Sequence, residues 1–264
     1  MPDVVLTEID RRGVATVTFN RPEVGNAYDS AVIEGLLDTM DAIEAQRGLR
    51  VLVLRGVGKH FQAGVDLKWL REVAAASEAE NVRVSRATAE AARRLNLLPF
   101  PTVALIQGAC FGGGTGFAAA CDVVIAADDA IFSIAETRWG LMASIIVPQL
   151  NDAMSVRHVR RYALTGERFG AHEARRVGLV HEVVPRADLE TAGARMVDQL
   201  LQNAPEATAQ TKSFVLEHAW SRITEPTFDR LVSAHAAKRR SAEAAEGVAS
   251  FVEKRSAQWY PGAH

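Results

Sequence analysis

The chain has 264 residues, of which 48% are apolar and 23% are charged, so a disordered or fibrous protein is excluded and a sizeable core is expected. Thirty basic and thirty-two acidic residues leave a net charge of −2, which offers no bulk attraction to nucleic acid or to an anionic membrane. The sequence shows neither a secretory leader pattern nor an apolar run of the roughly 20 residues that cross a bilayer, and its two cysteines cannot form a disulfide framework. We therefore expect a cytoplasmic protein.

Strands and helices alternate along the first half of the chain. Residues 4–19 predict two strands around a turn at Gly13, and Asp29 or Ser30 caps a helix with apolar residues at helical spacing. Continuous apolar runs at residues 51–54 and 103–106 are typical of strands buried on both faces. The remaining elements that we expect are a helical stretch at 67–97 broken near Ser77, strands at 123–126, 131–134 and 181–184, and helices from residue 155 onward.

This order of elements predicts an α/β fold. The chain is expected to divide into an α/β core at residues 1–195 and a C-terminal helical region at residues 196–264.

Two glycine-bearing loops each follow a buried strand and lead into a helix. The first covers residues 60–68 and includes Gly64, and the second covers residues 108–116 and includes three consecutive glycines. Free backbone N–H groups collect where a helix begins, and glycine lets a ligand approach the backbone closely. Two such junctions can converge on one oxygen, which is the geometry of an oxyanion hole. The alternative is that the glycines serve only turns and close packing.

Other ligand-binding motifs do not fit. Phe117 stands where a dinucleotide fingerprint requires its last glycine, and the P-loop and nucleophile-elbow patterns are absent from the sequence. His172 and Glu173 are not followed by the second histidine of a zinc protease, and Cys110 and Cys121 have no histidine pair nearby. We therefore expect neither a metal nor a separate cofactor.

The loops and their surroundings resemble the crotonase superfamily, also called the enoyl-CoA hydratase/isomerase family. The resemblance covers nearly the whole chain in order. Its motifs are Asn20-Arg21-Pro22 with Asn26-Ala27, residues 61–68, residues 108–116 with Cys121-Asp122, residues 132–136 with 140–141, residues 164–169 with 178–180, and residues 251–255.

The resemblance implies a crotonase-like spiral of ββα units with a C-terminal helical trimerisation region, assembled as a homotrimer or hexamer. The substrate would be an acyl-CoA thioester, so that coenzyme A enters as part of the substrate. The backbone N–H groups of Val65 and Gly113 would hold the thioester oxygen as it becomes an enolate, because preorganised donors stabilise such a charge without rearrangement. Glu136 would be the catalytic carboxylate.

Further residues are expected at the substrate by the same resemblance. The backbone around Val24, Ala63 and Leu67 would hold the adenine. Lys68 and Lys254 lie at positions from which they could contact the phosphates of the substrate. Trp69 is a candidate for the acyl pocket, with ordinary core packing as the alternative. His60 and Asp66 are expected to be structural, because an acidic residue in the first turn more often stabilises the helix.

One position departs from the family pattern. Family hydratases use two glutamates, and Gly116 stands at the position of the first, which leaves Glu136 as the remaining carboxylate. A lone Glu before an Arg is otherwise usually solvated or a helix cap, but in an apolar pocket its pKa would rise toward neutrality and suit proton transfer. A single carboxylate can shuttle a proton between carbons. For the addition of water, it provides one glutamate where family hydratases use two.

Three functions remain open at this point. The first is a hydratase of an enoyl-CoA, including branched or glutaconyl-type thioesters, because residues 136–141 and 145–148 resemble a bacterial branch that hydrates such substrates. Arg138 is a candidate partner for their distal carboxylate, and a surface or structural ion pair is the alternative. The second function is a Δ3,Δ2-type enoyl-CoA isomerase that uses Glu136 alone. The third is a non-catalytic protein that binds CoA thioesters.

Overall fold

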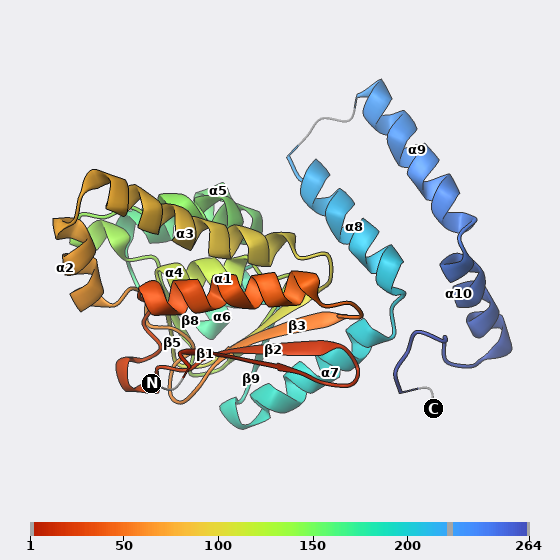
Figure 1. Ribbon diagram of the computed structural model, residues 1–264, viewed down its shortest axis with the longest axis horizontal. Helices are drawn as coiled ribbons and strands as arrows, with labels where there is room; N and C mark the ends of the chain where they lie inside the picture. Colours follow the sequence, from red (N-terminus) through yellow and green to blue (C-terminus); the bar gives the residue numbers. More distant parts are fainter. Residues whose placement is uncertain (1–2, 221–223, 263–264) are drawn as a thin grey trace.

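The protein is built around a six-stranded sheet, seen in the computed structural model in Figure 1, which describes residues 3–220 and 224–262. The strand order is β1-β2-β3-β4-β6-β9, in which β1 and β2 pair antiparallel and the other neighbours pair parallel. A smaller sheet has the order β5-β7-β8. The strands are β1 (Val5–Ile9), β2 (Val14–Phe19), β3 (Val51–Gly56), β4 (Thr102–Ile106), β5 (Ala109–Phe111), β6 (Val123–Ala127), β7 (Ile131–Ser133), β8 (Phe169–Gly170) and β9 (Glu182–Val184).

Alternate residues of the central strands enter two separate cores. One face of the sheet packs with α1 (Ser30–Ala45) and α3 (Glu78–Leu97), where Leu52, Leu54 and their neighbours are fully buried. The opposite face packs against α7 (Leu189–Leu201) through Val51, Val53 and their neighbours. The apolar runs of these strands are therefore explained by burial on both faces, as the sequence predicts.

Two helices begin at residues to which the sequence draws attention: Asp29, one of two expected caps, and Ser77, where a break was expected. The Asp29 carboxylate accepts from the Val32 N–H at 3.1 Å, and the Ser77 hydroxyl accepts from the Glu80 N–H at 3.3 Å. Ser77 thereby separates α2 (Leu67–Ala75) from α3. The remaining α-helices are α4 (Gly113–Ala119), α5 (Val147–Thr165), α6 (Ala171–Arg176), α8 (Pro205–His218), α9 (Glu225–Arg239) and α10 (Ala242–Glu253).

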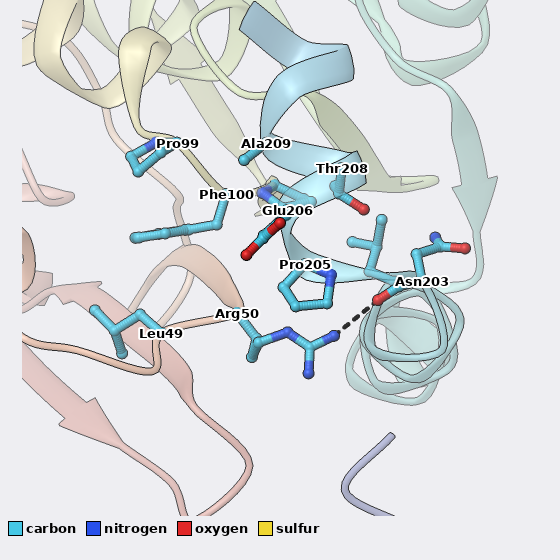
Figure 2. A pocket seen from close by; sticks show the side chains of 11 residues that line it. Leu49, Arg50, Pro99, Phe100, Asn203, Pro205, Glu206, Thr208 and Ala209 are labelled. Atoms are coloured by element: carbon cyan, nitrogen blue, oxygen red, sulfur yellow. Dashed lines mark hydrogen bonds between the residues drawn. The ribbon is translucent and has the colours of Figure 1, made fainter. Parts of the chain in front are cut away.

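Helices α8, α9 and α10 extend from the body as an arm (Figure 1). Arg50 ties the base of the arm to the sheet, donating to the carbonyls of Asn203 at 2.8 Å, Leu201 at 3.1 Å and Trp259 at 2.7 Å. Figure 2 shows Arg50 beside Pro205 at this junction, where a cavity of about 250 Å³ is formed. Several large apolar side chains of the arm are exposed: Val215, Phe228, Val232, Val248, Phe251 and Val252.

Three details differ from the sequence-based expectation. The division at 195/196 falls inside α7, which belongs to the core because it packs on the sheet, so the change in architecture lies between α7 and α8. Helix α5 begins at Val147 instead of residue 155, and Ser155 interrupts it with φ 66° and ψ 150°. Strands β5 and β8 were not expected, because three and two residues are too short to show a sequence pattern.

Candidate active site

The two glycine-bearing loops lie side by side and are joined by backbone hydrogen bonds. Gln62 forms a parallel bridge with Cys110, in which the Gln62 N–H donates to the Ala109 carbonyl and the Phe111 N–H donates to the Gln62 carbonyl, both at 3.0 Å. On its other side the first loop pairs with Tyr28, which forms a parallel bridge with Val65. The structure therefore brings together the two loops that the sequence singles out.

The N–H groups of Val65 and Gly113 are both free to bind a ligand. The Tyr28 bridge uses the Gly64 carbonyl and the Asp66 N–H, which flank Val65, so the N–H of Val65 itself points away from Tyr28. Gly113 is the first residue of α4, where an N–H has no partner within the helix. Neither N–H has a hydrogen-bond partner within residues 3–220 and 224–262. Two uncommitted donors on adjoining loops are the elements of an oxyanion hole.

The second loop needs its glycines for conformation and for space. Gly112 has φ 50° and ψ −117°, which a residue with a side chain rarely adopts. A Cβ on Gly114 would lie 2.8 Å from the Gln62 carbonyl oxygen. The Gln62 side chain is fully buried, accepts from the Gly64 N–H at 2.9 Å and donates to the Gly64 carbonyl at 3.1 Å. Gln62 therefore fixes the first loop against the second.

Glu136 lies beside the second loop. A Cβ on Gly112 would be 3.0 Å from Glu136 Oε1, so the carboxylate faces the residue that precedes Gly113. Its Oε2 atom is buried and has no hydrogen-bond partner among the described residues. Burial raises the pKa of the Glu136 carboxyl above its ordinary value, because the charged form loses its hydration. A carboxylate in this setting is a candidate proton carrier.

Ile146 occupies the space beside Gly116. A Cβ on Gly116 would lie 2.7 Å from Ile146 Cβ, and Ile146 is itself buried, with 4% of its surface exposed. An apolar side chain therefore occupies the space that a side chain at position 116 would need.

Tyr28 is a site residue that the sequence analysis missed. A Cβ on Gly113 would lie 2.6 Å from Tyr28 Cε1 and 3.2 Å from the Tyr28 hydroxyl oxygen, so the ring rests on the second donor residue. Burial, and secondarily the charge of Glu136, raise the pKa of Tyr28 to about 12. Its position directly after the Asn26-Ala27 motif is the only signal in the sequence that could have drawn attention to it.

Asp66 and His60 both make contacts that fix the loops. Asp66 caps α2 through the N–H of Lys68 at 2.9 Å and pairs with Arg21 at 3.3 Å. Burial acts to raise the pKa of the Asp66 carboxyl, but the capping hydrogen bonds and the Arg21 charge together lower it below its ordinary value. His60 Nδ1 accepts from the Ala109 N–H at 2.9 Å and thereby joins the two loops.

The residues expected around the adenine lie in the first loop and in the segment that contains Val24. The Ala63 N–H donates to the Gly25 carbonyl at 2.9 Å, which places Ala63 against the segment that contains Val24. Leu67 and Lys68 begin α2, and both are exposed. Trp69 is half-buried and packs edge-to-face on Tyr28 with ring centroids 5.9 Å apart.

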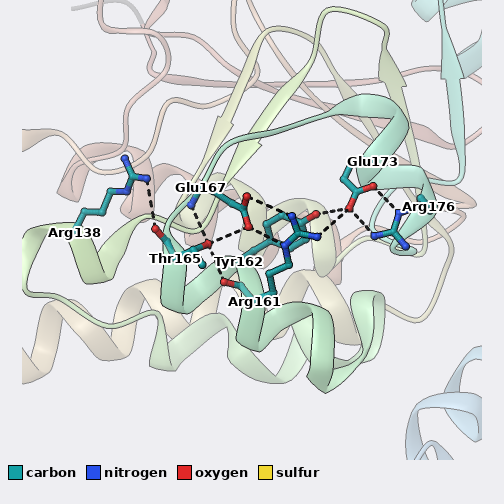
Figure 3. A network of polar contacts seen from close by, with 7 residues as sticks. All are labelled: Arg138, Arg161, Tyr162, Thr165, Glu167, Glu173 and Arg176. Atoms are coloured by element: carbon teal, nitrogen blue, oxygen red, sulfur yellow. Dashed lines mark hydrogen bonds and ion pairs between the residues drawn. The ribbon is translucent and has the colours of Figure 1, made fainter.

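Arg138 and Lys254 are both exposed. Arg138 packs over Gly166 and donates to the Thr165 carbonyl at 3.5 Å, beside the ion-pair network of α5 and α6 in Figure 3. Lys254 is exposed at the end of α10, in the arm. Within one subunit, the structure therefore does not gather Lys254 with the loops of the site.

Two further searches concern metals and membranes. Within the described ranges, no group of three or more His, Cys, Asp or Glu side chains could hold a metal ion. None of the helices in the same ranges combines the length and the apolar character needed to cross a membrane.

Comparisons with known proteins agree with this geometry. The family model described as enoyl-CoA hydratase/isomerase matches residues 10–261. A putative enoyl-CoA hydratase of Thermus thermophilus is 31% identical over 250 residues, which cover 95% of this chain and 98% of that protein. The mitochondrial Delta(3,5)-Delta(2,4)-dienoyl-CoA isomerase of Dictyostelium discoideum is 30% identical over 260 residues, which cover 95% and 88% of the two chains.

Solved structures show the same fold. The crystal structure of an enoyl-CoA hydratase from Shewanella pealeana superimposes with a TM-score of 0.92 at 33% identity and covers 97% of this chain and 96% of that one. The expected crotonase-like α/β fold is thereby confirmed. The chain belongs to the enoyl-CoA hydratase/isomerase family and is an enzyme of this kind.

Proposed function

We propose that the protein is an enoyl-CoA hydratase that adds water across the double bond of an enoyl-CoA thioester. The observation that carries the proposal is the buried Glu136 carboxylate beside the free N–H groups of Val65 and Gly113. This combination supplies one proton carrier and two donors for an enolate oxygen.

The reaction follows from these groups. Glu136 takes a proton from water as the water oxygen bonds to the β-carbon, and the electron pair of the double bond moves onto the thioester oxygen. The N–H groups of Val65 and Gly113 stabilise that oxygen. Protonated Glu136 then delivers its proton to the α-carbon as the enolate collapses. One water molecule is added, and Glu136 returns to its starting state.

A Δ3,Δ2-isomerase is the second candidate, because Glu136 could carry a proton between two carbons without any water. A relative that is named as a Delta(3,5)-Delta(2,4)-dienoyl-CoA isomerase supports this alternative. A non-catalytic thioester-binding protein would leave the raised pKa of Glu136 without a use.

For the acyl group we propose a branched or glutaconyl-type chain. Arg138 lies two residues from Glu136, is exposed, and has no carboxylate partner within the described residues, so its guanidinium is available to a distal carboxylate. Its contact with Thr165 supports the structural alternative. Replacement of Arg138 with Gln separates the two, because a substrate role predicts a higher KM for glutaconyl-CoA and an unchanged KM for crotonyl-CoA.

We also propose a homotrimer or hexamer. The arm exposes apolar side chains that a monomer would leave in water, including Phe251 with 84% of its surface exposed. Assembly would also provide the one route by which Lys254 could approach the phosphates of a substrate bound to a neighbouring subunit.

The deciding experiment offers the purified enzyme a panel of enoyl-CoA thioesters with straight, branched and glutaconyl-type acyl groups. Water addition is followed by the gain of one water in mass, and double-bond migration by absorbance at constant mass. Water addition by the native protein supports the hydratase. Migration of the double bond without water addition would establish the isomerase. Tight binding of a thioester without either reaction would support the non-catalytic binding protein.

A further inference from the structure

Two polar groups of the site make no hydrogen bond to another side chain or to the backbone within residues 3–220 and 224–262. Glu136 Oε2 is buried, whereas the Tyr28 hydroxyl oxygen reaches solvent. Buried polar groups in native proteins are nearly always paired, so Glu136 Oε2 requires a partner, and the Tyr28 hydroxyl is available to bind one. Both flank the same peptide, because Glu136 Oε1 faces Gly112 and the Tyr28 ring faces Gly113.

The two groups are complementary. Burial raises the pKa of Tyr28 to about 12, so its hydroxyl keeps its proton near neutral pH and can donate a hydrogen bond to the site. Ionised Glu136 offers only acceptors. A water molecule between them can accept from the phenol and donate to the carboxylate, which satisfies both groups at once.

Tyr28 is also held firmly in place. Its N–H donates to the Gly64 carbonyl at 3.0 Å, and its carbonyl accepts from the Asp66 N–H at 2.8 Å. Its ring packs between Gly113 and Trp69. The same residue thus aligns the backbone around Val65 and directs its hydroxyl past Gly113, so the hydroxyl is fixed relative to both oxyanion donors.

We propose that Tyr28 holds the attacking water against Glu136. This inference rests on the proposed hydratase function. The phenol donates to the water oxygen, which turns one O–H bond of the water toward Glu136 and the oxygen lone pair toward the β-carbon. Tyr28 keeps its own proton throughout, so the balance of the reaction is unchanged. Because Ile146 fills the space beside Gly116, Tyr28 takes the orienting role without a second carboxylate.

The test compares two reactions in the same folded enzyme. Hydration of an enoyl-CoA from the panel needs the oriented water. Exchange of the α-hydrogens of butyryl-CoA with deuterium oxide needs only Glu136 and the oxyanion hole. Tyr28→Phe keeps the ring and removes only the hydroxyl, so kcat for hydration should fall about tenfold or more while KM and α-hydrogen exchange stay unchanged.

Tyr260→Phe is the matched control. The Tyr260 hydroxyl donates to Asp198 at 2.8 Å on α7, away from the two glycine loops, so its loss should leave the ratio of hydration to exchange as in the native enzyme. The ratio does not depend on how much of a variant is folded, because the same folded molecules catalyse both reactions. A reduced melting temperature of Tyr28→Phe therefore does not obscure the result.

Equal losses of hydration and exchange in Tyr28→Phe, or no loss of either, would overturn the role of Tyr28 and leave the hydratase proposal standing. A native enzyme that exchanges α-hydrogens but hydrates no thioester of the panel would refute both proposals. Glu136→Gln should abolish both reactions, which confirms that the exchange reports on this site.

Discussion

Replacement of Glu136 with Gln should lower activity and raise stability at the same time. The carboxylate is the only proton carrier identified at the site, and such groups contribute about 10²–10⁴-fold to rate, so kcat should fall by about that factor. Binding of a CoA thioester should persist, because Gln keeps the shape of the side chain and leaves the backbone donors untouched.

The gain in stability follows from the burial of Glu136. Its Oε2 atom is buried with no hydrogen-bond partner among the described residues, and burial raises the pKa of the carboxyl. Ionised Glu136 therefore costs the native state more than a neutral amide does. Gln keeps the shape of the side chain and removes the cost of burying a charge, so we expect a gain on the order of 1 kcal/mol. In a chain of this size that corresponds to a rise in Tm of about 2–4 °C.

The gain in Tm on replacement of Glu136 with Gln should depend on pH. Above the raised pKa, Glu136 is ionised in the folded protein and its cost is present in full. Below the ordinary pKa of 4.5, the carboxyl is protonated in both the folded and unfolded states, and the cost disappears. The Tm advantage of Glu136→Gln should therefore be largest at alkaline pH and shrink as the pH falls through the raised pKa toward 4.5.

Thermal melts of the native protein and of Glu136→Gln across this pH range measure the advantage. Glu8→Gln is the control, because Glu8 is an exposed carboxylate on β1 and its replacement should change neither Tm nor activity. A Tm difference that stays constant with pH, or a lower Tm for Glu136→Gln at pH 8, would contradict the reasoning. Full activity of Glu136→Gln on a true substrate would remove Glu136 from the mechanism.

The other predictions concern the oxyanion hole, the strained helix, the assembly and the missing carboxylate. Gly113→Val should reduce turnover about 10²-fold or more, because the new Cβ would press on the Tyr28 ring and displace an N–H donor of the oxyanion hole. Unchanged kinetics in a folded variant would show that Gly113 is not such a donor. Ser155→Gly should raise the free energy of unfolding by about 1 kcal/mol or more, measured by denaturant titration, because φ 66° with ψ 150° is a glycine conformation. Light scattering at micromolar concentration should give the mass of three or six chains, and a monomer mass would count against the proposed assembly. Gly116→Glu alone should destabilise the protein, because Ile146 fills the space that the new side chain needs. The double variant Gly116→Glu/Ile146→Ala should fold, and it should hydrate crotonyl-CoA faster than the single variant Ile146→Ala.

The fold was predictable where burial or capping leaves a local pattern. The runs at residues 51–54 and 103–106 are continuously apolar because both faces of the sheet are covered, and Asp29 and Ser77 cap helices through contacts within three residues. The short strand β8 lacked such a pattern, because it depends on pairing with β7, a partner distant in the sequence.

The same distinction applies to the site. Val65, Gly113 and Glu136 lie in motifs that can be recognised one loop at a time. Tyr28 could not be found in this way, because its importance arises from two contacts across the fold: the bridge to Val65 and the ring packing on Gly113. The occupation of the space beside Gly116 by Ile146 is likewise a three-dimensional fact, as the two residues are thirty positions apart.

That occupation changes the meaning of glycine at position 116. A glycine facing an empty pocket would indicate a hydratase that had lost a catalytic group and retained the room for it. Here the room is taken by a buried apolar side chain, so the wall beside Gly116 is a packed part of the core. In the mechanism that we propose, polar contact with the water molecule comes from Glu136 on one side and from Tyr28 on the other. A site with one base, one fixed hydroxyl and an apolar wall can still direct water to carbon, provided that the hydroxyl supplies the orientation that a second carboxylate would give.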